Sequence, residues 1–169
     1  MIIDIQEKLV PVVKYPHRLI DNTEVLILLA QELGIPILVT EQYPKGLGKT
    51  VPRINDRINK NMIYEKISFS AYTDEIASNL AGLERKKIII TGMETHVCVY
   101  QTVRDLIAMN YQVFVVGDAV GSREKRNYKN ALDLMSGMGA VITNTETVFF
   151  DLIKVAGTPM FKKMSPLIK

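Results

Sequence analysis

The sequence contains little of what several classes of protein depend on. Of its 169 residues, one is cysteine, two are histidine and none is tryptophan. A single cysteine excludes an intrachain disulfide and is typical of a reducing compartment, so we expect a cytoplasmic protein. The cysteine and histidine residues do not have the spacing of metal ligands, so neither a metal nor another cofactor is expected. No apolar run approaches the ~20 residues that cross a membrane, and no signal peptide is recognised, so no membrane partner is expected.

The sequence also lacks a large excess of positive or negative charge. The net charge is only +3, and the basic residues are spread along the chain rather than gathered beside aromatic residues. Nucleic-acid binding is therefore not expected. Hydrophobic residues make up 47% and charged residues 23% of the chain, which is ordinary for a globular protein. A chain of this length can bury a sizeable core, and we expect one domain over residues 1–169.

Short apolar runs alternate with amphipathic stretches along the chain. The runs span residues 1–5, 35–40, 62–64, 87–91, 113–116 and 140–142. Runs without polar alternation are typical of parallel strands that are covered on both faces. Apolar residues with helical spacing lie at 19–33, 99–107, 131–138 and 143–156, the last opening with a capping box at Thr143–Glu146. The pattern predicts a three-layer α/β/α fold with a doubly wound, mostly parallel six-stranded sheet of order 3-2-1-4-5-6.

The single cysteine, Cys98, lies between the predicted strand at 87–91 and the predicted helix at 99–107. Backbone N–H groups and the dipole at the start of a helix lower the pKa of a nearby thiol, so we expect thiolate at neutral pH. The alternative is a small buried hydrophobic residue, which is the commoner role of a lone cysteine. The Gly-x-x-Thr turn at 92–95 favours the functional interpretation.

Two further residues are placed to join this cysteine. Asp4 and Cys98 both lie at carboxyl ends, after the first and fourth predicted strands. Those strands are neighbours where the strand order reverses, which is where such sheets bind ligands. Lys66 follows the third apolar run, and by itself it would be a solvated surface lysine. An acid, a lysine and a cysteine together indicate nucleophilic amide chemistry.

Two segments do not fit the alternating pattern. Residues 41–61 are rich in proline, glycine and charge, and they leave the second strand at the edge of the proposed site. A lid over the site and a solvated connection are both open interpretations. The basic tail at 157–169 is expected to pack against a neighbouring element or to fray.

Five segments follow one another along the chain: Ile2–Gln6, Val39–Gly48, Glu65–Ser70, Gly92–Val99 and Asp118–Arg123. With these segments in this order, nearly the whole chain resembles the isochorismatase-like cysteine hydrolases. The stretch Glu41–Gly48 is most similar to the subgroup called isochorismatase domain-containing proteins. The resemblance also implies residues before the first strand, whereas Met1 already lies in it, so we expect a shortened start.

The resemblance implies a catalytic triad of Asp4, Lys66 and Cys98. It also implies a cis peptide bond between Met93 and Glu94, which turns the Glu94 N–H toward the reacting carbonyl. That N–H and the Cys98 N–H would form an oxyanion hole. Cys98 would attack the carbonyl, Asp4 would act as acid and base, and water would hydrolyse the resulting thioester.

Candidate substrate-binding residues are Gln42, Tyr43, Phe69, Tyr72 and Glu94. Core packing is an equal alternative for Phe69 and Tyr72.

Three other polar residues receive structural interpretations. Asp118 and Arg123 are expected to form an ion pair that stabilises their loop. His96 lies two residues before Cys98, a spacing that directs side chains to different faces of a helix. We therefore expect His96 to act as a cap or in a structural hydrogen bond.

The chain also departs from parts of the family. Metal-binding nicotinamidases carry an Asp-x-His-x-x-His pattern where residues 41–61 contain no histidine, so that metal site is not expected. Enzymes that act on isochorismate commonly lack the cysteine, so Cys98 favours metal-independent cleavage of a C–N bond in a small amide- or ureido-type molecule. Vinyl ether hydrolysis and a non-catalytic oligomeric scaffold remain alternatives. The family commonly forms dimers or larger assemblies, so a homo-oligomer is expected.

Overall fold

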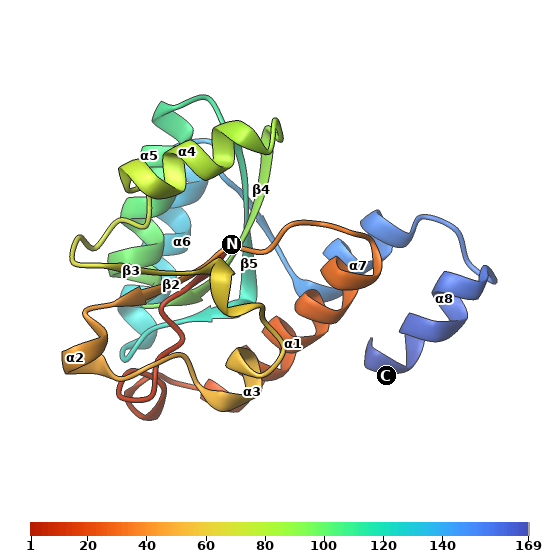
Figure 1. The fold of residues 1–169 in the computed structure, drawn as a ribbon, viewed down its shortest axis with the longest axis horizontal. Coiled ribbons are helices and arrows are strands. Elements are labelled where there is room, and N and C mark those ends of the chain that lie inside the picture. The colour runs from red at the N-terminus through yellow and green to blue at the C-terminus, as the bar shows by residue number, and fades with distance from the viewer. Residues whose placement is uncertain (169) are drawn as a thin grey trace.

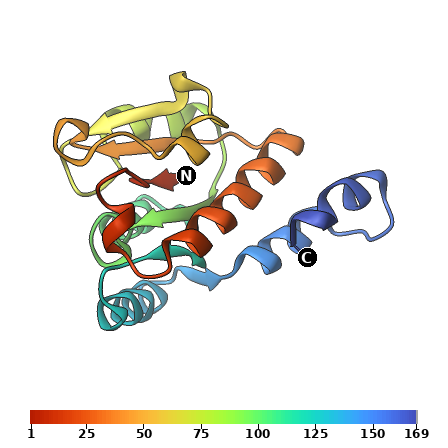
Figure 2. The same cartoon turned by 90° about the horizontal axis from the view of Figure 1, so that it is seen from below.

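A parallel sheet organises the fold. A computed structural model describes residues 1–168, in which six strands are ordered β3-β2-β1-β4-β5-β6. All paired strands are parallel. The strands are β1 (Ile2–Ile3), β2 (Val39–Gln42), β3 (Ile63–Lys66), β4 (Lys87–Met93), β5 (Gln112–Gly121) and β6 (Val141–Thr143). The predicted doubly wound topology is confirmed, and Figure 2 shows the strands stacked from yellow β3 to blue β6.

Helices cover both faces of the sheet, as Figure 1 shows. They are α1 (Pro16–Glu32), α2 (Pro44–Leu47), α3 (Pro52–Asn55), α4 (Asp74–Gly82), α5 (Tyr100–Ala108), α6 (Lys125–Gly137), α7 (Thr145–Ile153) and α8 (Pro159–Met164). Shorter turns are η1 (Val10–Val12), η2 (Lys60–Met62), η4 (Ser165–Ile168) and the π-helical turn η3 (Thr95–Val99). Helices α1 and α7 contact each other on one face, and α4, α5 and α6 share a core on the other.

Neighbouring residues of β1 pack into different halves of the core. Ile2 joins the cluster that contains Leu19 and Ile27 of α1. Ile3 joins the cluster that contains Val103 of α5, together with residues of α4 and α6. Successive side chains of a strand point to opposite faces of a sheet. A strand that is covered on both sides must therefore be apolar at every position, as the sequence of β1 is.

A glycine brings β1 and β4 close together. Gly92 has φ +128°, and a Cβ atom there would lie 2.0 Å from the carbonyl oxygen of Ile3. Only glycine combines this backbone conformation with such a close approach. The contact lies where β1 and β4 end, so the residues that follow the two strands emerge side by side.

Two strands lie later in the sequence than predicted. The run at 35–40 becomes a strand only from Val39 to Gln42, and Pro36 in its first half has no N–H to donate to a ladder. The run at 62–64 becomes Ile63–Lys66, which makes Lys66 the last residue of β3. The shift places the lysine at the same sheet edge as Gln42.

Helix boundaries also differ from the prediction. Helix α4 was not predicted; its N-cap is Thr73, whose hydroxyl accepts the Ile76 N–H at 3.4 Å. The cap of α7 is Asn144, which accepts the Thr147 N–H at 2.8 Å, rather than Thr143. Helix α7 ends at Ile153, so the prediction of a helix through residue 156 was too long. On α6, the apolar face holds Ala131 and Met135, whereas the Leu134 side chain is 47% exposed.

The C-terminal segment packs rather than frays. Met164 of α8 is buried against Leu29 of α1 and Phe149 of α7. Lys163 forms an ion pair with Glu32 at the end of α1. Among the described helices, none is both long enough and apolar enough to cross a membrane.

Candidate active site

A buried ion pair lies at the carboxyl edge of the sheet. Asp4 follows β1 and Lys66 ends β3, and the Lys66 ammonium lies 2.7 Å from Asp4 Oδ2. Their side chains are 0% and 1% exposed. The Thr40 hydroxyl of β2 donates to Asp4 Oδ1 at 2.7 Å. Both carboxylate oxygens therefore have a donor, which offsets the cost of removing the charge from water.

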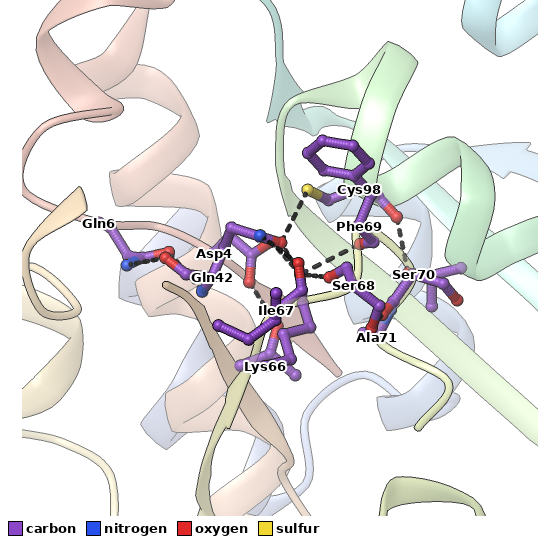
Figure 3. A network of polar contacts seen from close by, with 12 residues as sticks. Asp4, Gln6, Gln42, Lys66, Ile67, Ser68, Phe69, Ser70, Ala71 and Cys98 are labelled. Carbon is purple, nitrogen blue, oxygen red and sulfur yellow. Dashed lines mark hydrogen bonds and ion pairs between the residues drawn. The ribbon is translucent and has the colours of Figure 1, made fainter. Parts of the chain in front are cut away.

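The Lys66 ammonium is surrounded by four oxygen atoms. Besides Asp4, it donates to Gln42 Oε1 at 2.9 Å and to the carbonyl oxygens of Ser68 at 3.2 Å and Phe69 at 3.1 Å. An ammonium has three hydrogens and no acceptor, so this shell matches the charged form of lysine. Figure 3 shows the cluster, with Cys98 beside Asp4 and Gln42.

Cys98 lies in the π-helical turn between β4 and α5, and only 5% of it is exposed. Its Sγ lies 4.0 Å from Gln42 Oε1. Its carbonyl oxygen accepts the Thr102 hydroxyl at 2.6 Å, and that hydroxyl accepts the Ala71 N–H at 2.8 Å. Thr102 thus joins the turn that holds the cysteine to the segment after β3.

The expected low pKa of Cys98 was wrong. Burial raises the thiol pKa to about 12; the negative charge of Asp4 and a hydrogen bond to it also raise it, as does the charge of Glu94. Lys66 lowers the pKa but does not outweigh these effects. The prediction counted the start of the helix and neglected burial and the carboxylates. At neutral pH Cys98 is therefore a neutral thiol near the charge of Asp4.

Glu94 follows a non-proline cis peptide bond from Met93, which the family resemblance implied. Its carboxylate is buried and accepts the backbone N–H of Arg123 at 3.0 Å and the Arg123 Nε at 3.1 Å. The expected ion pair between Asp118 and Arg123 was wrong. Asp118 Oδ1 instead accepts the N–H and hydroxyl of Thr145, at 2.8 and 2.9 Å, at the start of α7.

The remaining candidates differ in their surroundings. Tyr43 and Phe69 are about half exposed. Tyr72 packs against the core and lies edge-on to Tyr111, with ring centroids 6.4 Å apart. Gln42 is buried, and its side chain bonds within the cluster rather than projecting from it.

The segment at 41–61 folds back onto the chain that follows β1. Thr50 forms an isolated antiparallel bridge with Gln6, and its N–H donates to the buried Glu41 carboxylate at 2.7 Å. The Val51 N–H donates to the Ile5 carbonyl at 3.0 Å. The short helices α2 and α3 lie in this segment. The segment is thus anchored to the chain that follows β1, and a lid over the site stays a prediction.

His96 makes the structural hydrogen bonds that were expected of it. Its Nδ1 lies 3.1 Å from the Ser122 hydroxyl, and its Nε2 lies 3.4 Å from Asn127 Nδ2. Within residues 1–168, no three His, Cys, Asp or Glu side chains are grouped as metal ligands would be.

Sequence reasoning missed Thr40, Thr102 and Gln6 as parts of this cluster. Thr40 and Gln42 are two residues apart on β2, so their side chains share one face of the sheet. Because side chains alternate along a strand, the position of Thr40 two residues before Gln42 could have identified it as part of the cluster. Nothing in the sequence identifies Thr102, because a threonine within a predicted helix does not by itself indicate a contact with another segment.

Comparison with known proteins identifies the family of the chain. Residues 1–147 match the isochorismatase domain. Isochorismatase domain-containing protein 1 of Salmo salar is 36% identical over 167 residues, which are 98% of this chain and 59% of that protein. This chain therefore spans less than two thirds of the length of that relative.

Two solved structures share the fold. A structure described as MAR1 ribonuclease from Caenorhabditis elegans is 38% identical with a TM-score of 0.93, over 99% of this chain and 86% of that one. The YcaC gene product of Escherichia coli, described as an octameric hydrolase of unknown specificity, is 26% identical with a TM-score of 0.86, over 91% and 78% of the two chains. The chain belongs to the isochorismatase family.

Proposed function

We propose that this protein is a metal-independent cysteine hydrolase that cleaves a C–N bond in a small amide- or ureido-type molecule. The observation that supports this most is a buried thiol beside a buried ion pair. Asp4 and Lys66 form the pair, with 2.7 Å between Oδ2 and Nζ. Gln42 Oε1 accepts from the Lys66 ammonium at 2.9 Å and lies 4.0 Å from the Cys98 sulfur. A nucleophile, a general base and a charge that orients the base are the parts that acyl transfer requires. The three side chains come from separate segments and converge where ligands bind in doubly wound sheets.

The first half of the reaction begins with proton transfer from Cys98 to Asp4. The sulfur forms a bond to the substrate carbonyl carbon, whose oxygen becomes an oxyanion. The backbone N–H groups of Glu94 and Cys98 would stabilise that oxyanion. Protonated Asp4 then gives its proton to the leaving nitrogen, the C–N bond breaks, and a thioester to Cys98 remains.

Water completes the reaction. Asp4 accepts a proton from the attacking water, the C–S bond breaks, and the thiolate recovers that proton from Asp4. Asp4 thus ends each cycle as a carboxylate paired with Lys66. Because the pKa of Cys98 is raised to about 12, attack depends on proton removal by Asp4 rather than on thiolate formed in advance.

The proposal is tested by ammonia release from a panel of small primary amides and ureido compounds. Turnover by the wild type should fall by roughly 10⁴-fold or more in Cys98→Ala, as in other enzymes that lose their nucleophile. Asp4→Asn should lose turnover while the Asp133→Asn control, at an exposed position, keeps it. Turnover that survives Cys98→Ala would contradict the mechanism, and isochorismate cleavage that survives it would favour vinyl ether hydrolysis.

RNA cleavage is a second candidate, because the 38% identical Caenorhabditis elegans structure is described as a ribonuclease. The same wild-type and Cys98→Ala proteins should be incubated with single-stranded RNA. Cleavage by the wild type that is lost in Cys98→Ala would assign the site to RNA. Absence of turnover of every substrate would favour a non-catalytic scaffold.

We also propose that the protein self-associates and acts in a reducing compartment such as the cytoplasm. The octameric YcaC gene product supports self-association, and reducing conditions protect a reactive thiol from oxidation. Sedimentation at micromolar concentration should show a species larger than the 19.0 kDa chain. A purely monomeric profile would contradict self-association.

A further inference from the structure

Beside the acid, the lysine and the cysteine lies a pair of buried glutamines. Gln6 follows β1 and is 0% exposed, and Gln42 ends β2. Gln6 Oε1 accepts the backbone N–H of Gln42 at 2.7 Å, and Gln6 Nε2 donates to the Gln42 carbonyl at 3.0 Å. One side-chain amide therefore holds both backbone polar groups of Gln42. Figure 3 shows the two glutamines side by side next to Asp4 and Lys66.

Gln6 also holds the end of the segment after β2. Its Nε2 donates to the carbonyl oxygen of Gly48, which follows α2, at 2.6 Å. Both Nε2 hydrogens and the Oε1 atom of Gln6 are thus used on backbone partners. A buried amide with this many satisfied groups is rigid, because each alternative orientation would leave a polar group unpaired.

The Gln42 side chain faces the reactive groups. Its Nε2 donates to the Ile67 carbonyl at 2.7 Å, and its Oε1 accepts from the Lys66 ammonium at 2.9 Å and lies 4.0 Å from Cys98 Sγ. The reverse orientation would turn an NH₂ group toward an ammonium that can only donate. The network therefore sets which end of the amide meets the lysine and the thiol.

From these contacts we propose that Gln6 and Gln42 are positioning residues: Gln6 clamps the Gln42 backbone, and Gln42 Oε1 holds the Lys66 ammonium and the Cys98 thiol in register with Asp4. Neither glutamine needs to touch the substrate for this role. The predicted change in kcat rests on the proposed hydrolase function, whereas the predicted change around the Lys66 ammonium can be measured without any substrate. It also differs from the expectation that Gln42 binds substrate.

The kinetic test uses Gln42→Met, which keeps the length of the side chain and removes both polar atoms. We expect kcat for amide turnover to fall by about 10- to 100-fold, as for other outer residues that orient reactive groups. KM should change by less than about threefold, because uniform substrate binding is not lost. The matched control is Gln31→Met, since Gln31 Nε2 donates to the Arg57 carbonyl on the surface.

Two kinetic outcomes overturn the proposal. A Gln42→Met protein with kcat within about twofold of wild type shows that the amide positions nothing. A higher KM with unchanged kcat makes Gln42 a substrate-binding residue instead. Circular dichroism and thermal melting must first show that the variant is folded.

A second measurement needs no substrate. The ¹⁵N–¹H signal of the Lys66 ammonium should be resolved in the wild type, because four oxygens shield it from exchange. Gln6→Met should shift or broaden that signal although Gln6 does not touch Lys66, and Gln31→Met should leave it unchanged. An unchanged Lys66 signal in folded Gln6→Met overturns the clamp. If Gln6→Met does not fold, an unchanged signal in Gln42→Met overturns the proposal equally.

The two readouts separate the two proposals. If the wild type hydrolyses no amide but the Lys66 signal responds to Gln6→Met, the hydrolase function fails and the positioning role stands. If amides are hydrolysed through Cys98, but substitution of either glutamine changes neither the Lys66 signal nor kcat, the hydrolase function stands and the positioning role fails.

Discussion

The Lys66 ammonium lies 2.7 Å from the Asp4 carboxylate, and both side chains are almost wholly buried. This pair cancels two charges within the protein and leaves the carboxylate next to a neutral thiol. In the proposed mechanism this carboxylate accepts the proton of that thiol. Because the two opposite charges lie side by side, their attraction offsets the cost of burying them.

Removal of the lysine charge should strongly destabilise the fold. In Lys66→Met, Asp4 would remain as a buried carboxylate without its cation, a change that typically costs about 3–5 kcal/mol. The control is Lys163→Met, which breaks an ion pair whose lysine side chain is 63% exposed and should cost less than about 1 kcal/mol. Urea denaturation at neutral pH measures both values. Equal, small losses would show that the buried pair contributes little.

The reactivity of Cys98 should increase steadily with pH. Because the thiol pKa is raised to about 12, the thiolate fraction grows about tenfold per unit from pH 6 to pH 10. Alkylation by iodoacetamide, followed by intact mass, should therefore accelerate without a plateau in that range. Cys98→Ala provides the blank. A plateau that begins below the free-thiol pKa of ~8.5 would show thiolate in the resting protein.

Cys98 should also make stability depend on alkaline pH. Burial in the folded protein raises its pKa to about 12, so above the free-thiol pKa of ~8.5 the unfolded chain loses this proton while the folded chain keeps it. The free energy of unfolding should then fall by up to about 1.4 kcal/mol per pH unit through that window. Cys98→Ala should lack this component. If the free energy of unfolding changed with pH equally in the wild type and in Cys98→Ala, the raised pKa of Cys98 would be contradicted.

Gly92 should not tolerate a side chain. In Gly92→Ala the new Cβ would meet the Ile3 backbone at 2.0 Å and a φ of +128°, so we expect loss of the folded state or a Tm lower by many degrees. Gly82→Ala is the control, because a Cβ at that helical position meets nothing within 4 Å. The control should stabilise by about 0.5–1 kcal/mol. Thermal melting distinguishes the two, and a wild-type Tm for Gly92→Ala would refute the close approach.

The topology could be predicted from the sequence because it depends on a coarse signal. Apolar runs without alternation indicate buried parallel strands, and their number and order survive errors in each boundary. The ends of the strands and helices were predicted less accurately. The strand predicted at 35–40 shifted to Val39–Gln42, and α4 was missed because its apolar face contains few residues, of which Ile76 and Leu80 are buried.

The site was only partly predictable. That Asp4 and Cys98 would meet follows from strand order, and Lys66 joined them through the family resemblance. The electrostatic state of Cys98 could not be read from the sequence. It depends on burial and on the distances to Asp4, Lys66 and Glu94, which no spacing rule gives.

The contacts of Gln6 and Gln42 could not be predicted from the sequence either. Gln6 and Gln42 belong to recognisable segments, but their partners are backbone groups of β2, Gly48 and Ile67. Backbone partners of a side chain leave no pattern of residue types in the sequence. Only the three-dimensional arrangement identifies them.

The central claim, that Cys98 is a nucleophile activated by Asp4, is tested most directly by trapping the acyl-enzyme. The protein is mixed with p-nitrophenyl acetate, and its intact mass and peptide masses are followed over time. The account predicts one acetyl group on Cys98 in the wild type, a much slower reaction in Asp4→Asn and none in Cys98→Ala. Acetylation that spares Cys98, or that proceeds equally fast in Asp4→Asn, would contradict it.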